Sequence, residues 1–237
     1  MTYRLPWGIP PNRSAIHSHS GAGIMDQIYR PPEHQVAPAI ISYVAGAHPV
    51  LMRVCGFVAS PRHGGNTDVL VQQILNGARE EGAETAVHYL NDLEFRCCQG
   101  CRYCKVNDSC RLDDDMQDLY RDLYRADGIV IGSPIYFGQM SGLAKCFLDR
   151  WFALMNPDFS SRLPAGKRGA LVFPQGDTDP GVYAAVPGHF SDTLEFFGIT
   201  VVDSFIAPGL QNLGDAAKDP VLMERAWRAG QMIVSGP

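Results

Sequence analysis

The chain has 237 residues, a hydrophobic content of 46% and a formal net charge of −5. This length fits one domain with an extension, and the apolar fraction is enough for a hydrophobic core. The negative charge argues against nucleic acid or an anionic membrane surface as the main partner. No apolar run approaches the length of a membrane span, and the first residues lack a signal-peptide core, so the expected location is cytoplasmic.

Residues 1–50 are rich in proline and histidine and show little periodicity. We expect an irregular N-terminal arm with one short ordered piece near residues 36–44. His17 and His19 could bind a metal ion, but no acidic or cysteine partner lies near them, which favours a solvated tail. Two roles stay open for the arm: wrapping a neighbouring subunit, or a loosely ordered extension.

From residue 51 to residue 237 the pattern becomes regular and predicts one α/β domain. Strands alternate with helices, which indicates a doubly wound parallel sheet, and five strands fit the flavodoxin-like order 2-1-3-4-5. In such a sheet the loops that follow the strands lie at one edge, where a ligand binds. The predicted elements are strands over 53–59, 84–90, 127–135, 169–173 and 200–206, and helices over 67–81, 113–125, 141–155, 181–197 and 220–234.

The loop after the first strand carries the features of a phosphate site. Pro61, Gly64 and Gly65 interrupt both strand and helix, and the next residues are typical of a helix start. Free N–H groups at a helix N-terminus, together with the helix dipole, attract a dianionic phosphate. The loop is neither a Walker loop nor a dinucleotide fingerprint, and an ordinary loop with a surface arginine stays open. The predicted phosphate-binding residues are Ser60, Arg62, Gly65, Asn66 and Thr67.

The segment 133–142 follows the central apolar strand and suits the wall of a flat ring. Its glycines allow close approach of the backbone, and its two aromatic side chains could stack on a ring or, alternatively, cap the core. Residues 174–178 would close a third side. A phosphate beside a ring indicates a mononucleotide, and FMN fits. The predicted ring-binding residues are Pro134, Ile135, Tyr136, Phe137, Gly138, Gln175 and Gly176.

Two segments together, Ser60-Pro-Arg-x-x-Gly-Asn-Thr67 and Gly132-Ser-Pro-Ile-Tyr-Phe-Gly138, resemble the NADPH-dependent FMN reductase family. The resemblance extends from about Arg53 to the C-terminus. It implies bound FMN, a homodimer or homotetramer, and reduction by NAD(P)H or by a protein donor. The flavin would then carry the chemistry, and we expect no catalytic side chain. Acceptors could be quinones, free flavin, dioxygen, peroxide or a metal ion.

Five of the seven cysteines lie in a loop over residues 97–110. In a reducing compartment this crowding indicates metal or redox chemistry rather than a disulfide framework. Two spacings of two residues and one of five bring four thiolates into a short run, as a [4Fe–4S] cluster requires. Cys97 is left spare, and Cys55 and Cys146 are expected in the core. The predicted cluster ligands are Cys98, Cys101, Cys104 and Cys110.

The cysteine spacing resembles the iron–sulfur flavoprotein branch of the same family. This resemblance implies a cluster that pairs with a flavin across a subunit interface. Zinc, redox disulfides and inert thiols stay open for the loop. The predicted function is an FMN-dependent oxidoreductase that passes electrons between NAD(P)H or a redox protein and an acceptor. There are three alternatives: a non-catalytic electron carrier, a cluster-free NAD(P)H:FMN or quinone reductase, and a zinc-stabilised interaction module.

Overall fold

A computed structural model describes residues 51–236. The predicted arm over residues 1–50, its ordered piece and its histidines therefore lie outside the described residues. Every helix within residues 51–236 is too short or too polar to cross a membrane.

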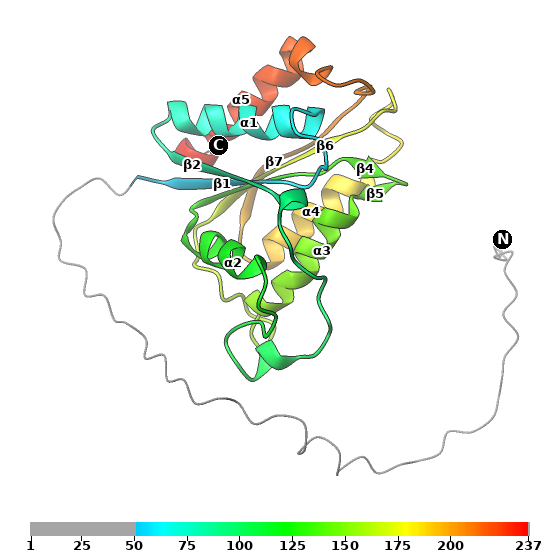
Figure 1. The fold of residues 1–237 in the computed structure, drawn as a ribbon. Helices are drawn as coiled ribbons and strands as arrows, with labels where there is room; N and C mark the ends of the chain where they lie inside the picture. Colours follow the sequence, from blue (N-terminus) through cyan, green and yellow to red (C-terminus); the bar gives the residue numbers. More distant parts are fainter. Residues whose placement is uncertain (1–50, 237) are drawn as a thin grey trace, which may run out of the picture. The chain divides into compact units, whose positions relative to one another are not determined.

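The centre of the molecule is a parallel sheet of five strands in the order β2-β1-β3-β6-β7 (Figure 1). This order is the predicted 2-1-3-4-5 when the strands of the sheet are counted along the chain, so the predicted fold is confirmed. All four neighbouring pairs are parallel. The strands are β1 (Arg53–Val58), β2 (Glu84–Tyr89), β3 (Gly128–Gly132), β6 (Arg168–Pro174) and β7 (Thr200–Ala207).

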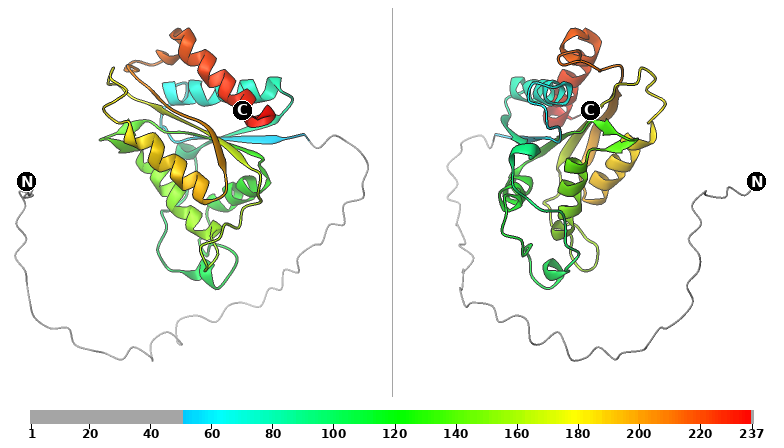
Figure 2. Two further views of the ribbon diagram at one scale, coloured as in Figure 1. Left: turned by 180° about the vertical axis from the view of Figure 1, so that it is seen from behind. Right: turned by 45° about the vertical axis from the view of Figure 1, so that its right-hand side comes forward.

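Helices cover both faces of the sheet, as Figures 1 and 2 show. Alternate residues of β1 point into the two cores: Val54 and Val58 pack on the side of α1 and α5, and Phe57 packs on the side of α2, α3 and α4. Both faces of β1 are therefore buried, which explains why its residues from Val54 to Val58 form a continuous apolar run. The helices are α1 (Asn66–Glu80), α2 (Met116–Arg125), α3 (Gly142–Arg150), α4 (Ala185–Phe196) and α5 (Pro220–Ser235).

Two predicted elements end earlier than expected. The strand predicted to reach residue 135 stops at Gly132, and a separate hairpin of β4 (Ile135–Tyr136) and β5 (Gln139–Met140) follows. Pro134 explains the break, because proline cannot donate a hydrogen bond to a central strand. The helix predicted to reach residue 155 ends at Arg150 and continues as a 3₁₀ turn, Trp151–Leu154.

Helices α1 and α5 pack closely because each carries a glycine at the contact. A Cβ atom on Gly230 would clash with the Ile74 carbonyl oxygen, and one on Gly77 would clash with the Trp227 carbonyl oxygen. Both obstacles are backbone atoms, so neither can move aside as a flexible side chain would.

We predict that Gly230→Ala lowers the free energy of unfolding by about 1–3 kcal/mol, because the added methyl group forces the two helices apart. Gly188→Ala is the matched control: Gly188 is exposed in α4 and a Cβ atom there meets nothing within 4 Å. It should raise stability by about 0.5–1 kcal/mol. Urea unfolding curves measure both changes, and equal effects of the two variants would contradict the close packing.

Candidate functional site

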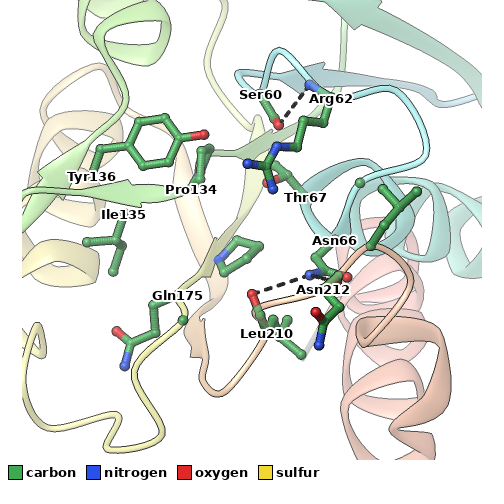
Figure 3. Close-up of a pocket in the computed structure, with 14 residues that line it drawn as sticks. Ser60, Arg62, Asn66, Thr67, Pro134, Ile135, Tyr136, Gln175, Leu210 and Asn212 are labelled. Carbon is green, nitrogen blue, oxygen red and sulfur yellow. Dashed lines mark hydrogen bonds between the residues drawn. The ribbon is translucent and has the colours of Figure 1, made fainter.

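A cavity of about 110 Å³ lies where the loops after β1, β3, β6 and β7 meet (Figure 3). These loops come together because they leave the same edge of the parallel sheet. This cavity is lined by every residue that was predicted to bind the phosphate or the flat ring, except Phe137 and Gly138. Its lining residues are Ser60, Arg62, Gly65, Asn66, Thr67, Pro134, Ile135, Tyr136, Pro174, Gln175, Gly176, Leu210, Asn212 and Leu213.

The loop before α1 uses some of its N–H groups internally and leaves those at the start of the helix without a partner. Helix α1 begins after Gly65 without a side-chain cap, so its first N–H groups have no intrahelical partner. The Arg62 N–H group donates to Ser60 Oγ at 3.2 Å, and the Gly64 N–H group donates to Asp68 Oδ2 at 2.8 Å. Among the described residues that line the cavity, Arg62 alone carries a charge. An anion therefore suits this end of the cavity.

Figure 3 shows the Arg62 guanidinium directed into the cavity, between Thr67 and Pro134. Asn66, in contrast, holds a neighbouring loop. Its Nδ2 atom donates to the Leu210 carbonyl at 3.4 Å and the Asn212 carbonyl at 2.9 Å, and its Oδ1 atom accepts from the Ala216 N–H group at 3.1 Å. The side chain of Asn66 thus positions a wall of the cavity.

That wall, residues 210–213, is absent from the sequence prediction. It follows β7 and so leaves the same sheet edge as the other ligand-binding loops. The sequence could have predicted this wall, because the segment follows the last predicted strand. The Leu210 N–H group donates to the Gln175 carbonyl at 2.9 Å, which joins this wall to the loop after β6.

The hairpin after β3 places its two central residues outside the cavity. Phe137 and Gly138 have φ angles of 50° and 76°, as a two-residue hairpin turn requires. The Phe137 side chain is fully exposed at the tip. Ile135 and Tyr136, which precede the turn, line the cavity. A positive φ angle is unusual for a residue as bulky as phenylalanine and strains the backbone at the tip.

Gln175 contributes a buried acceptor. Its Nε2 atom donates to the carbonyl oxygens of Asp177 at 3.1 Å and Asp179 at 2.8 Å, which fixes the orientation of the amide. Among the described residues, no donor reaches its buried Oε1 atom. The amide of Gln175 thus holds the loop after β6, which forms one wall of the cavity. A phosphate end with an arginine beside an apolar wall of Pro134 and Ile135 fits FMN.

The four predicted cluster cysteines line one smaller cavity of about 20 Å³. Arg102, Arg111 and Arg150 line it as well, so thiolates there would face positive charge. Within residues 51–236 no three potential ligands stand close enough together to hold a single metal ion. Four cysteines that line one cavity are a donor set that both an iron–sulfur cluster and a zinc ion accept.

Arg150 organises this second cavity and is 1% exposed. Its guanidinium makes two hydrogen bonds to the Asp114 carboxylate, at 2.7 and 2.9 Å. It also donates to the Arg96 carbonyl at 2.7 Å and contacts Cys110 Sγ at 3.5 Å. Burial alone would lower the pKa of Arg150, but the hydrogen bonds with Asp114 and Tyr120 outweigh burial and raise the pKa.

The cysteine loop starts at the edge that holds the first cavity, but it runs along α3 to the other end of that helix (Figure 1). Cys104 and Lys105 contact the Phe152 carbonyl, beyond the end of α3. Ser141 caps the opposite end. The nine residues of α3 span about 13 Å. Because the loop follows β2, a position at the same sheet edge as the first cavity would be expected from the sequence, and the structure corrects this expectation.

Two further cysteines differ from prediction. Cys97 and Cys146 are joined in a disulfide, so Cys97 is not spare and the half-buried Cys146 is not simply a core residue. The prediction failed because the two residues are 49 positions apart and meet only in the folded chain. Cys55 is fully buried, as expected, and burial raises the pKa of its thiol.

Comparison with known proteins gives one family match and several relatives. The family model described as NADPH-dependent FMN reductase matches residues 52–204. An iron–sulfur flavoprotein of Methanocaldococcus jannaschii is 43% identical over 99 residues, which are 42% of this chain and 51% of that protein. This match thus spans about half the length of that relative. An iron–sulfur flavoprotein of Methanosarcina thermophila is 30% identical over 64% of this chain and 77% of its own length.

Solved structures support the fold. An NAD(P)H:quinone oxidoreductase from Methanothermobacter marburgensis has a TM-score of 0.62. The alignment covers 77% of this chain and 96% of that one, with 18% sequence identity. At this identity the likeness concerns the fold alone.

We predict that Arg150→Met lowers the free energy of unfolding by about 3–5 kcal/mol, because it leaves the Asp114 carboxylate buried without its cation. Asp114 has an 11% exposed side chain. Arg121→Met is the control, since Arg121 pairs with Asp118 at the surface, and it should change stability by less than about 1 kcal/mol. Urea unfolding monitored by circular dichroism tests the pair, and similar small losses in both variants would contradict this role for Arg150.

Proposed function

The chain belongs to the NADPH-dependent FMN reductase family and to its iron–sulfur flavoprotein branch, and on this premise we propose that it is an FMN-dependent NAD(P)H oxidoreductase with a [4Fe–4S] cluster. It passes electrons from NAD(P)H or a redox protein to an acceptor such as a quinone, a flavin or dioxygen. The observation that carries the proposal is the cavity at the sheet edge, where an uncapped helix start and Arg62 face one end.

Each part of that cavity has a binding role in the proposal. Arg62 and the N–H groups at the start of α1 hold the phosphate. Pro134 and Ile135 present an apolar surface to the flavin ring, and Gln175 and Gly176 form the wall on the side of β6. Bound FMN supplies hydride and single-electron transfer. The side chains thus bind and orient the cofactor, and none acts as an acid or base.

The experiment that tests this proposal compares wild-type protein with Arg62→Ala. The variant should bind FMN about 10- to 150-fold more weakly, since a charge-assisted hydrogen bond contributes about 1.5–3 kcal/mol. Fluorescence titration of FMN gives the affinity. Absorbance at 340 nm follows NAD(P)H oxidation, which should fall in parallel at subsaturating FMN.

Arg79→Ala is the matched control, because Arg79 is exposed near the far end of α1. It should leave FMN affinity unchanged. Unchanged affinity in Arg62→Ala would remove Arg62 from the phosphate site. A wild-type protein that holds FMN but oxidises neither NADH nor NADPH would instead be an electron carrier, and the enzymatic part of the proposal would fail.

For the cluster we propose Cys98, Cys101, Cys104 and Cys110 as ligands. Their support is that all four line one cavity, to which Cys97 does not contribute. Arg150 contacts Cys110 and offsets the negative charge that four thiolates and the cluster would bring.

We predict that Cys97→Ser, purified without air, keeps about four iron atoms per chain, as a [4Fe–4S] centre on four thiolates requires. Cys101→Ser or Cys104→Ser should lose the iron while FMN remains bound, because the flavin cavity shares no residue with the cysteine cavity. Iron and flavin analysis of these three variants and of Cys98→Ser measures this. If Cys97→Ser lost its iron and Cys98→Ser kept it, the ligand assignment would be wrong.

We further propose that the protein is a homodimer or homotetramer with the β4–β5 hairpin at a contact between subunits. Phe137 is fully exposed and holds a strained backbone conformation, and the neighbouring Tyr136 is 44% exposed. Exposed aromatic side chains of this kind are typical of interfaces.

Light scattering at micromolar concentration should give a multiple of the 26.0 kDa chain mass. Phe137→Asp should weaken the assembly because it places a charge in an apolar contact. Val221→Asp, at an exposed position on α5, is the control and should not change the mass. A monomer that holds both cofactors would rule out this assembly.

A further inference from the structure

Cys97, in the cysteine loop, and Cys146, in α3, stand apart from both cavities. Neither residue lines the FMN cavity or the cysteine cavity. Their Cα atoms are 4.7 Å apart, and the structure joins their sulfur atoms in a disulfide. Cα separations of about 4.4–6.8 Å are the range that a disulfide bridges without backbone movement.

Contacts other than the disulfide hold the two residues together. Arg150 follows Cys146 by one helical turn and so lies on the same face of α3. Its guanidinium donates to the carbonyl of Arg96, the residue before Cys97, at 2.7 Å. Gln99 Nε2 donates to the carbonyl of Cys97 itself at 2.8 Å. The backbone around Cys97 is thus anchored beside α3, and the two thiols would stay close after reduction.

The two sulfur atoms differ in access. Cys97 is exposed, whereas Cys146 is half-buried in α3. An external thiol therefore reaches Cys97 first, and Cys146 is the leaving group. Along α3, Cys146 lies about 7.5 Å from Ser141, which bonds to the end of β1, and about 6 Å from Arg150, which lines the cysteine cavity. The pair occupies the stretch of helix between the two proposed cofactor sites.

We propose that Cys97 and Cys146 form a redox-active dithiol–disulfide pair whose substrate class is an external dithiol or its disulfide. This activity goes beyond the proposed oxidoreductase function and requires neither FMN nor the cluster. The pair accepts two electrons and two protons when it is reduced and returns them when it is oxidised.

The exchange balances without another reactant. A thiolate of the external dithiol attacks Cys97 Sγ, a mixed disulfide forms, and the Cys97–Cys146 bond breaks. Cys146 leaves as a thiolate and takes up a proton. The second thiol of the reductant then attacks the mixed disulfide, which releases Cys97 as a thiol and leaves the reductant as a disulfide. The reverse sequence reduces an external disulfide and restores the bond.

The test uses the full-length protein with its cofactors, purified without air and equilibrated in mixtures of reduced and oxidised dithiothreitol. Free thiols are trapped with N-ethylmaleimide and identified by peptide mass spectrometry. We expect Cys97 and Cys146 to change together, from both blocked to both labelled, in native buffer. Lys145→Gln is the matched control, because Lys145 is exposed beside Cys146 and lines neither cavity, and the Cys97–Cys146 pair of this variant should behave as in the wild type.

Single variants separate the roles of the two cysteines. With oxidised glutathione as the probe, Cys146→Ser should accumulate a mixed disulfide at Cys97. Cys97→Ser should form one at Cys146 about tenfold more slowly, because that sulfur is less accessible. Equal rates at the two positions would overturn the assignment of Cys97 as the sulfur that exchanges with external thiols and disulfides.

Two results would overturn the proposal itself: both thiols remain free in fully oxidised buffer, or the disulfide is reduced only after the protein is denatured. FMN content, iron content and NAD(P)H oxidation are measured in the same samples. A reversible pair in a protein without flavin would contradict the proposed function alone. An inert pair in a protein that holds FMN and oxidises NAD(P)H would contradict this inference alone.

Discussion

The candidate site depends on the way the ends of two parallel strands, β1 and β3, are tied together. The Ala59 N–H group donates to the Gly132 carbonyl at 2.8 Å, which joins the ends of β1 and β3. The buried Ser141 hydroxyl donates to the Ala59 carbonyl at 2.7 Å and accepts from the Ala144 N–H group. One side chain thus fixes both the end of β1 and the start of α3. This bond thus fixes the position of the phosphate loop relative to the ring wall at the sheet edge that they share.

Helix α3 connects this sheet edge to the cavity lined by the cysteine loop. Ser141 caps its first turn at the FMN cavity, Cys146 meets Cys97 in the middle, and Arg150 holds the cysteine loop at its end. A helix is a rigid spacer with a rise of about 1.5 Å per residue, so these three positions are fixed relative to one another. This geometry separates the two cavities and gives each its own electrostatic surroundings.

The sequence was sufficient for the strand order and most of the first cavity, because apolar periodicity and glycine positions are local signals. Ser60, Arg62 and Thr67 could be assigned from the strand–loop–helix pattern alone. The role of Asn66 could not, since its partners are between 144 and 150 residues away. Phe137 does not line the cavity, because a two-residue turn that the pattern does not show as a separate element places it at the exposed hairpin tip. Long-range contacts and turn geometry account for these differences.

The central claim is that one chain carries a flavin cavity and a cluster cavity at opposite ends of α3. Its most direct test is the FMN, iron and acid-labile sulfide content of wild-type protein purified without air, relative to chain concentration. The account predicts about one FMN and about four iron and four sulfide per chain. Protein that contains zinc in place of iron, or iron without flavin, would contradict it.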